Sequence, residues 1–112
     1  MLKKELVKHV EIEEISQLMS EKLLSVENNI IGYQSVLRNL ESAKNLLSAK
    51  DPEEVFTLGG DCGVEVCPIT YLNKRHNSDL LVLWIDAHGD LNTPASSPSK
   101  TFHGMPLRMI LG

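Results

Sequence analysis

Residues 80–93 read LLVLWIDAHGDLNT, and this stretch decides the class of fold. Its first six positions, residues 80–85, are all apolar, which is typical of a strand buried on both faces of a parallel sheet. Asp86, His88 and Asp90 follow at alternate positions. Because alternate side chains of an extended segment point the same way, the sequence predicts two carboxylates and an imidazole facing one point.

A second strand and a connecting helix precede this stretch. Val55 to Leu58 form a short β-prone run closed by two glycines. Residues 63–75 are typical of a helix, in which Pro68 indicates a late start or a kink. Residues 55–85 therefore predict one βαβ unit with a right-handed crossover. Ligands bind outside the carboxyl ends of the strands in such sheets, so the motifs GGDC and DAHGD are expected at one edge.

Two amphipathic helices are predicted before the first strand. Apolar residues recur every three or four positions in residues 11–27 and again in residues 29–49, as expected for faces packed on a core. Asp51-Pro52 ends the second helix, because the residue before a proline is pushed out of the α region. Residues 104–112 begin another helix or a strand. The expected fold class is α/β with a parallel sheet.

Composition and charge exclude several classes of protein. The 112 residues carry a formal net charge of −4 with scattered lysines and arginines, which gives no footprint for nucleic acid. There is neither a polybasic membrane patch nor an apolar run of the roughly 20 residues that a membrane-spanning helix needs. Residues 1–12 are too charged for a signal peptide, and the two cysteines match no zinc or redox spacing. A cytoplasmic protein is therefore expected.

The alternating Asp86, His88 and Asp90 favour a metal site. A bare pair of carboxylates at this position would repel unless a cation lay between them. Oxygen and imidazole ligands together suit Mn²⁺, Fe²⁺ or Zn²⁺, and the majority of oxygen ligands favours Mn²⁺. The alternative is a capped loop in which both carboxylates accept hydrogen bonds from backbone N–H groups and His88 takes no part.

Three motifs occur together in the second half of the chain: LGGDC at 58–62, DAHGDLNT at 86–93 and HGMP at 103–106. With this combination the sequence resembles the arginase/agmatinase/formiminoglutamase family, the ureohydrolases. The resemblance covers roughly residues 29–112, whereas residues 1–28 form a weakly matched helical segment. It implies a partial, truncated three-layer α/β/α fold around a parallel sheet, corresponding to the N-terminal half of the family domain.

The resemblance also implies a metal centre. In the family two manganese ions are bridged by the first Asp of the DAHxD motif, and this position is Asp86. The next two ligand positions are His88 and Asp90. The family usually has a histidine after GGD, where this chain has Cys62, whose softer sulfur favours Zn²⁺ or Fe²⁺. The metal ligands implied are therefore Asp86, His88, Asp90 and Cys62.

Further positions match the substrate side of the family's site. Asn92 and Ser99 hold the positions that bind the amino-acid end of arginine in arginases. His103 matches a histidine that shuttles protons or contacts substrate, so His103 and Asp86 are the catalytic residues implied. Arginine-type members commonly have an asparagine where this chain has Thr101. The substrate implied is a small guanidino or formimino compound.

The activity implied is hydrolysis of linear amidines by a metal-activated hydroxide. The family's remaining metal carboxylates lie on a later strand, so the 112-residue chain alone is expected to have little or no hydrolase activity. Two alternatives stay open: a non-catalytic metal-binding remnant or interaction partner, and a mononuclear zinc hydrolase of the deacylase type. Family members commonly form trimers or hexamers, so a homo-oligomer is expected once the fold is completed.

Overall fold

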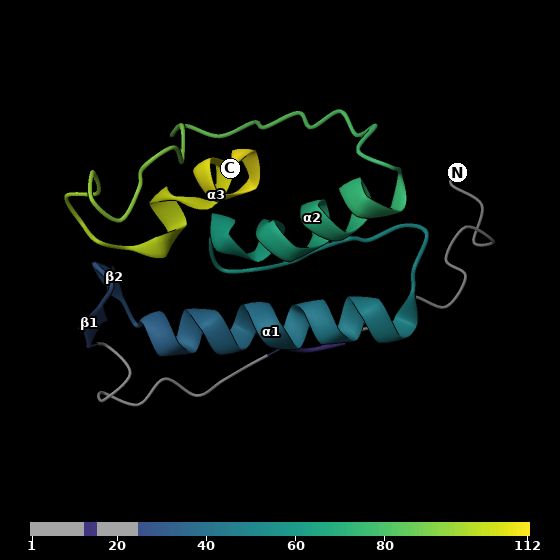
Figure 1. Ribbon diagram of the computed structural model, residues 1–112, viewed down its shortest axis with the longest axis horizontal. Helices are drawn as coiled ribbons and strands as arrows, with labels where there is room; N and C mark the ends of the chain where they lie inside the picture. The colour runs from purple at the N-terminus through teal and green to yellow at the C-terminus, as the bar shows by residue number, and fades with distance from the viewer. Residues whose placement is uncertain (1–12, 16–24) are drawn as a thin grey trace, which may run out of the picture.

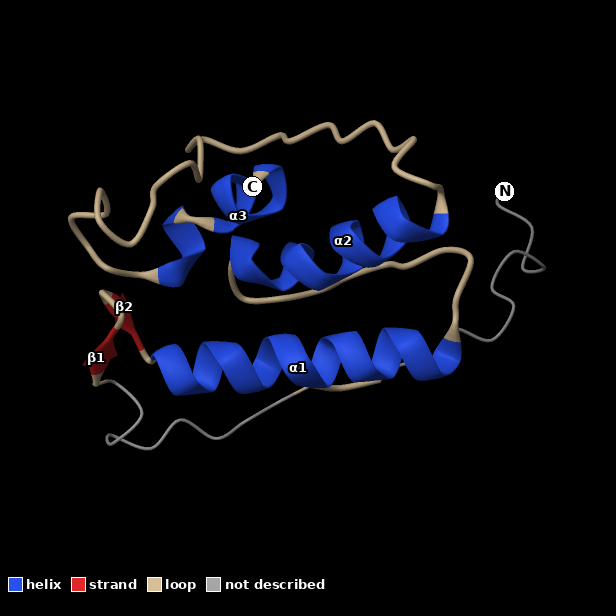
Figure 2. Cartoon of the chain, in the orientation of Figure 1, coloured by secondary structure: helices blue, strands red, loops and turns tan. Residues whose placement is uncertain are grey.

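The structure, a computed structural model, describes residues 13–15 and 25–112 (Figure 1). Two long helices lie one above the other, and a third, shorter helix lies beside the second one (Figures 1 and 2). The elements are β1 (Val26–Glu27), β2 (Ile30–Ile31), α1 (Tyr33–Lys50), the 3₁₀ turn η2 (Cys62–Glu65), α2 (Val66–Arg75), the 3₁₀ turn η3 (Phe102–Gly104) and α3 (Pro106–Leu111).

Strands β1 and β2 form a small antiparallel hairpin. Its turn residues, Asn28 and Asn29, both have positive φ angles, 52° and 60°, the combination that a tight two-residue hairpin turn requires. Val26 therefore lies in a strand, and the helix predicted for residues 11–27 is wrong at its end and also at residues 13–15, which are not helical. Residues 11–12 and 16–24 of that prediction lie outside the described part of the chain.

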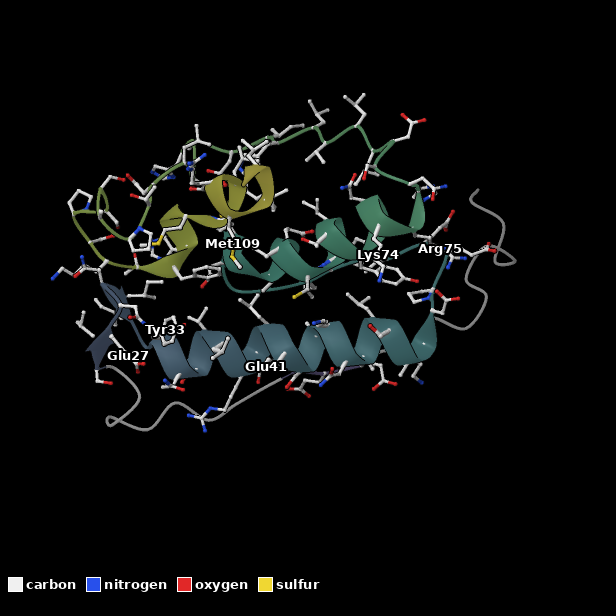
Figure 3. All side chains as sticks on the ribbon, viewed as in Figure 1. Glu27, Tyr33, Glu41, Lys74, Arg75 and Met109 are labelled. Carbon is white, nitrogen blue, oxygen red and sulfur yellow. The ribbon has the colours of Figure 1, made fainter. Side chains whose placement is uncertain are left out.

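Helix α1 confirms the helix predicted for residues 29–49, with a later start. It begins after Gly32, whose φ of 66° breaks the preceding strand, and it ends at Asp51 before the proline. Figure 3 shows Tyr33 at its start and Glu41 near its middle. One contact to α2 is direct: the Cys67 thiol donates to the carbonyl oxygen of Leu40 at 3.2 Å.

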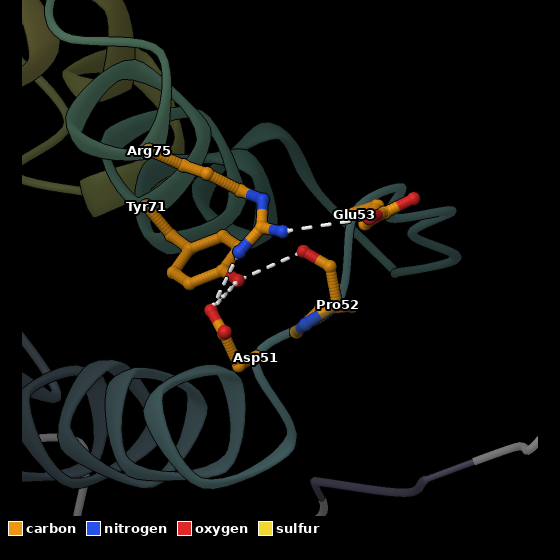
Figure 4. A network of polar contacts seen from close by, with 5 residues as sticks. All are labelled: Asp51, Pro52, Glu53, Tyr71 and Arg75. Atoms are coloured by element: carbon orange, nitrogen blue, oxygen red, sulfur yellow. Dashed lines mark hydrogen bonds and ion pairs between the residues drawn. The ribbon is translucent and has the colours of Figure 1, made fainter.

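A polar cluster joins the end of α1 to the end of α2 (Figure 4). The Tyr71 hydroxyl lies 2.9 Å from Asp51 Oδ1 and 2.8 Å from the carbonyl oxygen of Pro52. Arg75 donates to the same Asp51 oxygen at 2.7 Å and lies 3.9 Å from Glu53. These bonds fix where the chain turns from α1 into the segment that leads to the site.

Helix α2 starts late, as Pro68 indicated. The chain first makes the 3₁₀ turn η2, whose first N–H groups are capped when the Asp61 carboxylate accepts from Gly63 N–H at 2.8 Å. The α-helix follows from Val66, so Pro68 lies in its first turn, where its missing N–H costs nothing.

The two predicted strands are not paired. Among the described residues, no backbone hydrogen bond holds residues 55–58 or 80–85 to a neighbouring strand. Leu81 is 95% exposed, and Leu83 and Ile85 are also exposed, so the prediction that residues 80–85 are buried on both faces is wrong for this structure. In Figure 1 this run passes over α2 on the side away from α1.

The interior that positions the site is small. Among the described residues the buried apolar side chains are Ile30, Val66, Pro68, Met105 and Pro106, of which Pro106 is fully buried. A cavity of about 480 Å³ separates α1 from residues 55–61 and from α2. Within the described part of the chain, no helix has both the length and the apolar character needed to cross a membrane.

Candidate metal centre

Cys62, Asp86 and Asp90 meet at one point. They come from the start of η2, the end of the apolar run and the following loop, and one ligand atom of each lies within 4.8 Å of the others. Cys62 precedes Asp86 by 24 residues, and the turn capped by Asp61 brings Cys62 to the two carboxylates. A sulfur atom and two carboxylates form a donor set for a transition-metal ion.

The Cys62 thiol is protonated in this arrangement. It donates to Asp86 Oδ2 at 3.1 Å. This hydrogen bond to a carboxylate, together with burial and the charge of Asp90, raises the pKa of the thiol to about 12. The sulfur therefore binds an ion only when the ion displaces its proton.

Asp86 is the central member of the cluster. Its Oδ1 accepts from the backbone N–H of His88 at 2.8 Å while its Oδ2 accepts from Cys62. The hydrogen bond from the His88 backbone, and then that from the thiol, hold the pKa of the Asp86 carboxyl below its ordinary value. Asp86 is therefore an anion at neutral pH.

Asp90 is the member of the cluster whose surroundings fit a cation best. It is only 5% exposed, and its Oδ2 is buried with no hydrogen-bond partner among the described residues. Its φ of 50° is left-handed, and its carbonyl oxygen accepts from Arg108 N–H at 3.0 Å, so α3 holds the residue in place. Burying a carboxylate oxygen without a partner is costly, and a positive ion between Asp90 and Asp86 would remove that cost.

His88 lies outside the three-residue cluster. Its side chain is 84% exposed, and its Nδ1 lies 3.5 Å from Asp86 Oδ1. The prediction assumed that the chain stays extended past residue 86. Instead it bends there, because the carboxylate of Asp86 accepts from the backbone of His88. Alternate side chains consequently do not face one point.

The loop after Asp90 carries the predicted substrate-side residues. Asn92 is half-buried and its backbone N–H donates to Gly104 at 3.1 Å, which ties the start of the loop to η3. Ser99 and His103 are exposed and are joined through Thr101. The loop is also tied to the hairpin, since Ile31 N–H donates to Lys100 at 2.8 Å.

Comparison with known proteins identifies the family. The model of the arginase family matches residues 3–112. The chain belongs to the arginase family. It is 36% identical to an arginase of Staphylococcus aureus (strain MRSA252) over 100 residues, which are 88% of this chain and 33% of that protein.

Two other relatives extend this comparison. The chain is 49% identical to the hepatic arginase of Aquarana catesbeiana over 85 residues, 74% of this chain and 26% of that protein. It is 34% identical to an arginase of Plasmodium berghei over 108 residues, 95% of this chain and 30% of that protein. The chain thus spans about a third of the length of the curated relatives that it matches. No solved structure matches the chain.

Membership of the arginase family gives the α/β class of the fold. In this chain the turn η2, which carries Cys62 of the cluster, is packed closely against the turn η3. One neighbour of the cluster is Gly63, where an added Cβ would lie 2.9 Å from the ring of Phe102. The absence of a side chain at Gly63 lets η3 approach η2. His103 and Cys62 are thereby carried on two turns in direct contact.

A groove of about 260 Å³ opens beside the cluster of this arginase-family chain. Its lining includes Cys62 and Asp86, the apolar run from Val82 to Ile85, and Glu65. Burial raises the pKa of the Glu65 carboxyl above its ordinary value. Glu65 was not predicted as a site residue, and its position three residues after Cys62 is the one signal that could have indicated it.

Proposed function

We propose that this chain forms part of the site of a metal-dependent hydrolase that cleaves C–N bonds of guanidino or formimino compounds. The observation that carries the proposal is the buried, unpartnered Asp90 carboxylate beside Asp86 and Cys62, in a chain that matches the arginase family. Each of the relatives described above is named an arginase.

The residues fit one metal ion better than two. Cys62, Asp86 and Asp90 offer one sulfur and two carboxylates, and His88 is close enough to Asp86 to join them by a rotation of its side chain. The sulfur favours Zn²⁺ or Fe²⁺ over the Mn²⁺ that an all-oxygen and imidazole set would favour. A bound ion of this kind would supply an activated water near neutral pH and polarise the substrate carbon.

The protein's own groups would orient the substrate and move protons. His103 carries an exposed imidazole, a side chain that can serve as a general acid or base. Asn92 and Ser99 stand on the same loop with amide and hydroxyl groups for the polar end of a small substrate. Asp86, ionised and hydrogen-bonded by the His88 backbone, would hold its orientation throughout.

The same proposal includes the arrangement of the complete domain. We expect residues 1–112 to be part of one ureohydrolase domain, in which residues 55–58 and 80–85 pair as parallel strands of a three-layer α/β/α sheet. The exposed, extended apolar run at 80–85 supports this pairing, because such a run is stable only between neighbouring strands. The two free cysteines of the chain, Cys62 and Cys67, suit the reducing cytoplasm. We also expect the complete domain to form a homo-oligomer.

A second candidate is a protein that binds one zinc ion, either without catalysis or as a mononuclear hydrolase of acylated amines. The three-group cluster supports it, since three protein ligands are typical of a mononuclear zinc centre.

Metal analysis tests the centre. The metal-free chain is loaded with Zn²⁺, Fe²⁺ without oxygen, or Mn²⁺, and bound metal is measured by mass spectrometry after dialysis. We expect about one equivalent of Zn²⁺ or Fe²⁺ and much less Mn²⁺. Cys62→Ser should reverse that preference, whereas Cys67→Ser, which removes the thiol bonded to Leu40, should leave it unchanged. Equal binding by Cys62→Ser and the unaltered chain would exclude this centre.

Hydrolysis is tested in a chimera. Residues 29–112 replace the matching segment of the Staphylococcus aureus arginase, and release of urea or formamide is followed with guanidino and formimino substrates. We expect turnover that is lost in Asp86→Asn and His103→Gln. A chimera that folds and binds metal but releases neither product would favour the non-catalytic candidate.

A further inference from the structure

Four polar side chains of the loop at residues 90–105, called the site loop below, form a row. Ser97, Ser99, Thr101 and His103 occupy alternate positions, and their side chains are linked in sequence. The oxygen-to-oxygen distances are 3.5 Å from Ser97 to Ser99 and 2.6 Å from Ser99 to Thr101. Thr101 Oγ1 lies 3.2 Å from His103 Nε2. The row runs from a buried hydroxyl to an exposed imidazole.

Backbone donors occupy the inner half of the row. Ser97, which is 7% exposed, accepts from Lys100 N–H at 3.1 Å. Ser99 accepts from Thr101 N–H at 3.3 Å. Each of these two oxygens therefore already has a donor, and the hydrogen of each hydroxyl must find an acceptor elsewhere.

The burial of Ser97 sets the direction of the row. If the hydrogens pointed inward, the Ser97 hydrogen would end in the interior with no acceptor among the described residues. A buried hydroxyl hydrogen without an acceptor is unfavourable. If the hydrogens point outward, Ser97 donates to Ser99, Ser99 donates to Thr101, and the Thr101 hydrogen has His103 Nε2 as its acceptor.

We propose that Thr101 is a positioning residue that donates to His103 Nε2 and thereby holds the neutral imidazole with its proton on Nδ1. The ring nitrogen that accepts a hydrogen bond cannot carry the proton, so the bond at Nε2 selects the tautomer. Asparagine would offer an amide at this position, whereas a threonine hydroxyl accepts from Ser99 and donates to His103 at the same time.

The proposal has a consequence for catalysis, which rests on the hydrolase function proposed above. With Nε2 engaged by Thr101, the Nδ1–H group is the one left to meet a substrate. The Ser99 hydroxyl is fully engaged within the row, because it donates to Thr101 and accepts from Ser97 and from Thr101 N–H. A substrate that binds Ser99 must therefore displace one of these bonds. At His103 the loop therefore presents an N–H donor, which favours a substrate with an oxygen or nitrogen acceptor at that point.

The tautomer can be read by NMR without any turnover. The full chain is labelled with ¹⁵N in its histidines, and long-range spectra are recorded at about pH 8.5, where imidazoles are neutral. The chain has four histidines, so the His103 signals are assigned by their loss in His103→Gln. We expect His103 to be mainly the Nδ1–H form.

Three variants test the role of the row. Thr101→Val keeps the shape but removes the hydroxyl, and the ratio of Nδ1–H to Nε2–H should fall about fivefold, the factor for one lost hydrogen bond. Thr101→Ser restores a hydroxyl and should restore the ratio. Ser97→Ala removes the inner end of the row and should lower the ratio less than Thr101→Val does. Amide spectra of each variant show whether the fold is kept.

The outcomes separate clearly. A His103 that is mainly Nε2–H in the unaltered chain, or a ratio unchanged in Thr101→Val, overturns the proposal. If Thr101→Val does not fold, the comparison of Ser97→Ala with the unaltered chain decides in its place. Because the measurement needs no metal and no substrate, failure of the hydrolase proposal leaves this one standing, and the reverse also holds.

Discussion

Two neighbouring segments of the chain differ in how far their backbones are hydrogen-bonded. The apolar run at residues 80–85 is extended and exposed, and no backbone hydrogen bond joins it to another described residue. The site loop at residues 90–105 is bonded to itself, to the hairpin and to α3. Yet the apolar run has the stronger tendency to form a regular element.

The two segments differ because their backbone hydrogen-bond partners come from different parts of the chain. The hydroxyl, amide and carboxylate groups of the loop satisfy its backbone from within a few residues. A strand has no such local source, because its N–H and C=O groups point sideways to neighbouring strands. A short polar loop can therefore satisfy its own backbone, whereas residues 80–85 have no bonded neighbour among the described residues.

The largest effect is expected at the first residue of the loop. Asp90→Asn keeps the shape and tolerates the left-handed backbone, but it removes the charge of the buried carboxylate. Affinity for Zn²⁺ should fall about 100-fold by calorimetric titration, as expected when a ligand charge is lost. Without metal the free energy of unfolding should stay equal or rise, since an unpartnered buried charge is gone. A less stable metal-free Asp90→Asn would show that Asp90 supports the loop directly.

A somewhat smaller effect is expected at the last residue of the loop. Met105 is 4% exposed, so Met105→Ala should lower the free energy of unfolding by about 2 kcal/mol through lost burial and a residual cavity. Urea denaturation followed by circular dichroism measures the change. Met109→Ala, at an exposed position on α3, is the matched control and should cost much less. Equal losses would mean that the end of the loop is no better packed than the surface.

The junction of the two segments is probed through the thiol. Hydrogen bonding to Asp86 raises the pKa of Cys62 to about 12, so little thiolate is present at about pH 8. Asp86→Asn removes the carboxylate, lowers that pKa and should speed alkylation by iodoacetamide about tenfold in a Cys67→Ser background. The sign follows from the raised pKa: the protonated thiol is the favoured form until pH rises through about 12. An unchanged rate would show that Asp86 does not hold the thiol proton.

The smallest effect is expected within the apolar run. Leu81 is already exposed, so Leu81→Lys should change the free energy of unfolding by less than about 0.5 kcal/mol. It should also reduce self-association, because a charge interrupts an exposed apolar strand edge. Light scattering and urea denaturation measure the two effects. A loss of stability comparable with that of Met105→Ala would mean that the run is buried in solution.

The helices could be predicted because their signals are local. The apolar spacing of α1 and the Asp51-Pro52 stop are properties of the nearby sequence, and Pro68 marked the late start of α2. The end of the first predicted helix failed because Asn28 and Asn29 adopt positive φ angles, and this turn chemistry outweighed the helical spacing that included Val26.

Three of the residues predicted as ligands, Cys62, Asp86 and Asp90, lie close together in the structure, and their role as ligands stays a prediction. Chain order alone suggested that Cys62 would approach the DAHGD motif, and the two do meet. The bend after Asp86 was not foreseen, because it depends on a carboxylate accepting from the His88 backbone. The exposure of residues 80–85 could not be predicted from their own apolar pattern, because burial of a strand depends on contacts with segments distant in sequence.

Gly63 lets the turns η2 and η3 lie close together, because it has no side chain. A Cβ added at residue 63 would lie 2.9 Å from the Phe102 ring and 2.9 Å from Asp61 Oδ1, closer than real Cβ contacts come. An alanine at Gly63 would therefore push the turns η2 and η3 apart, and the distance between Cys62 and His103 would change although neither side chain is altered.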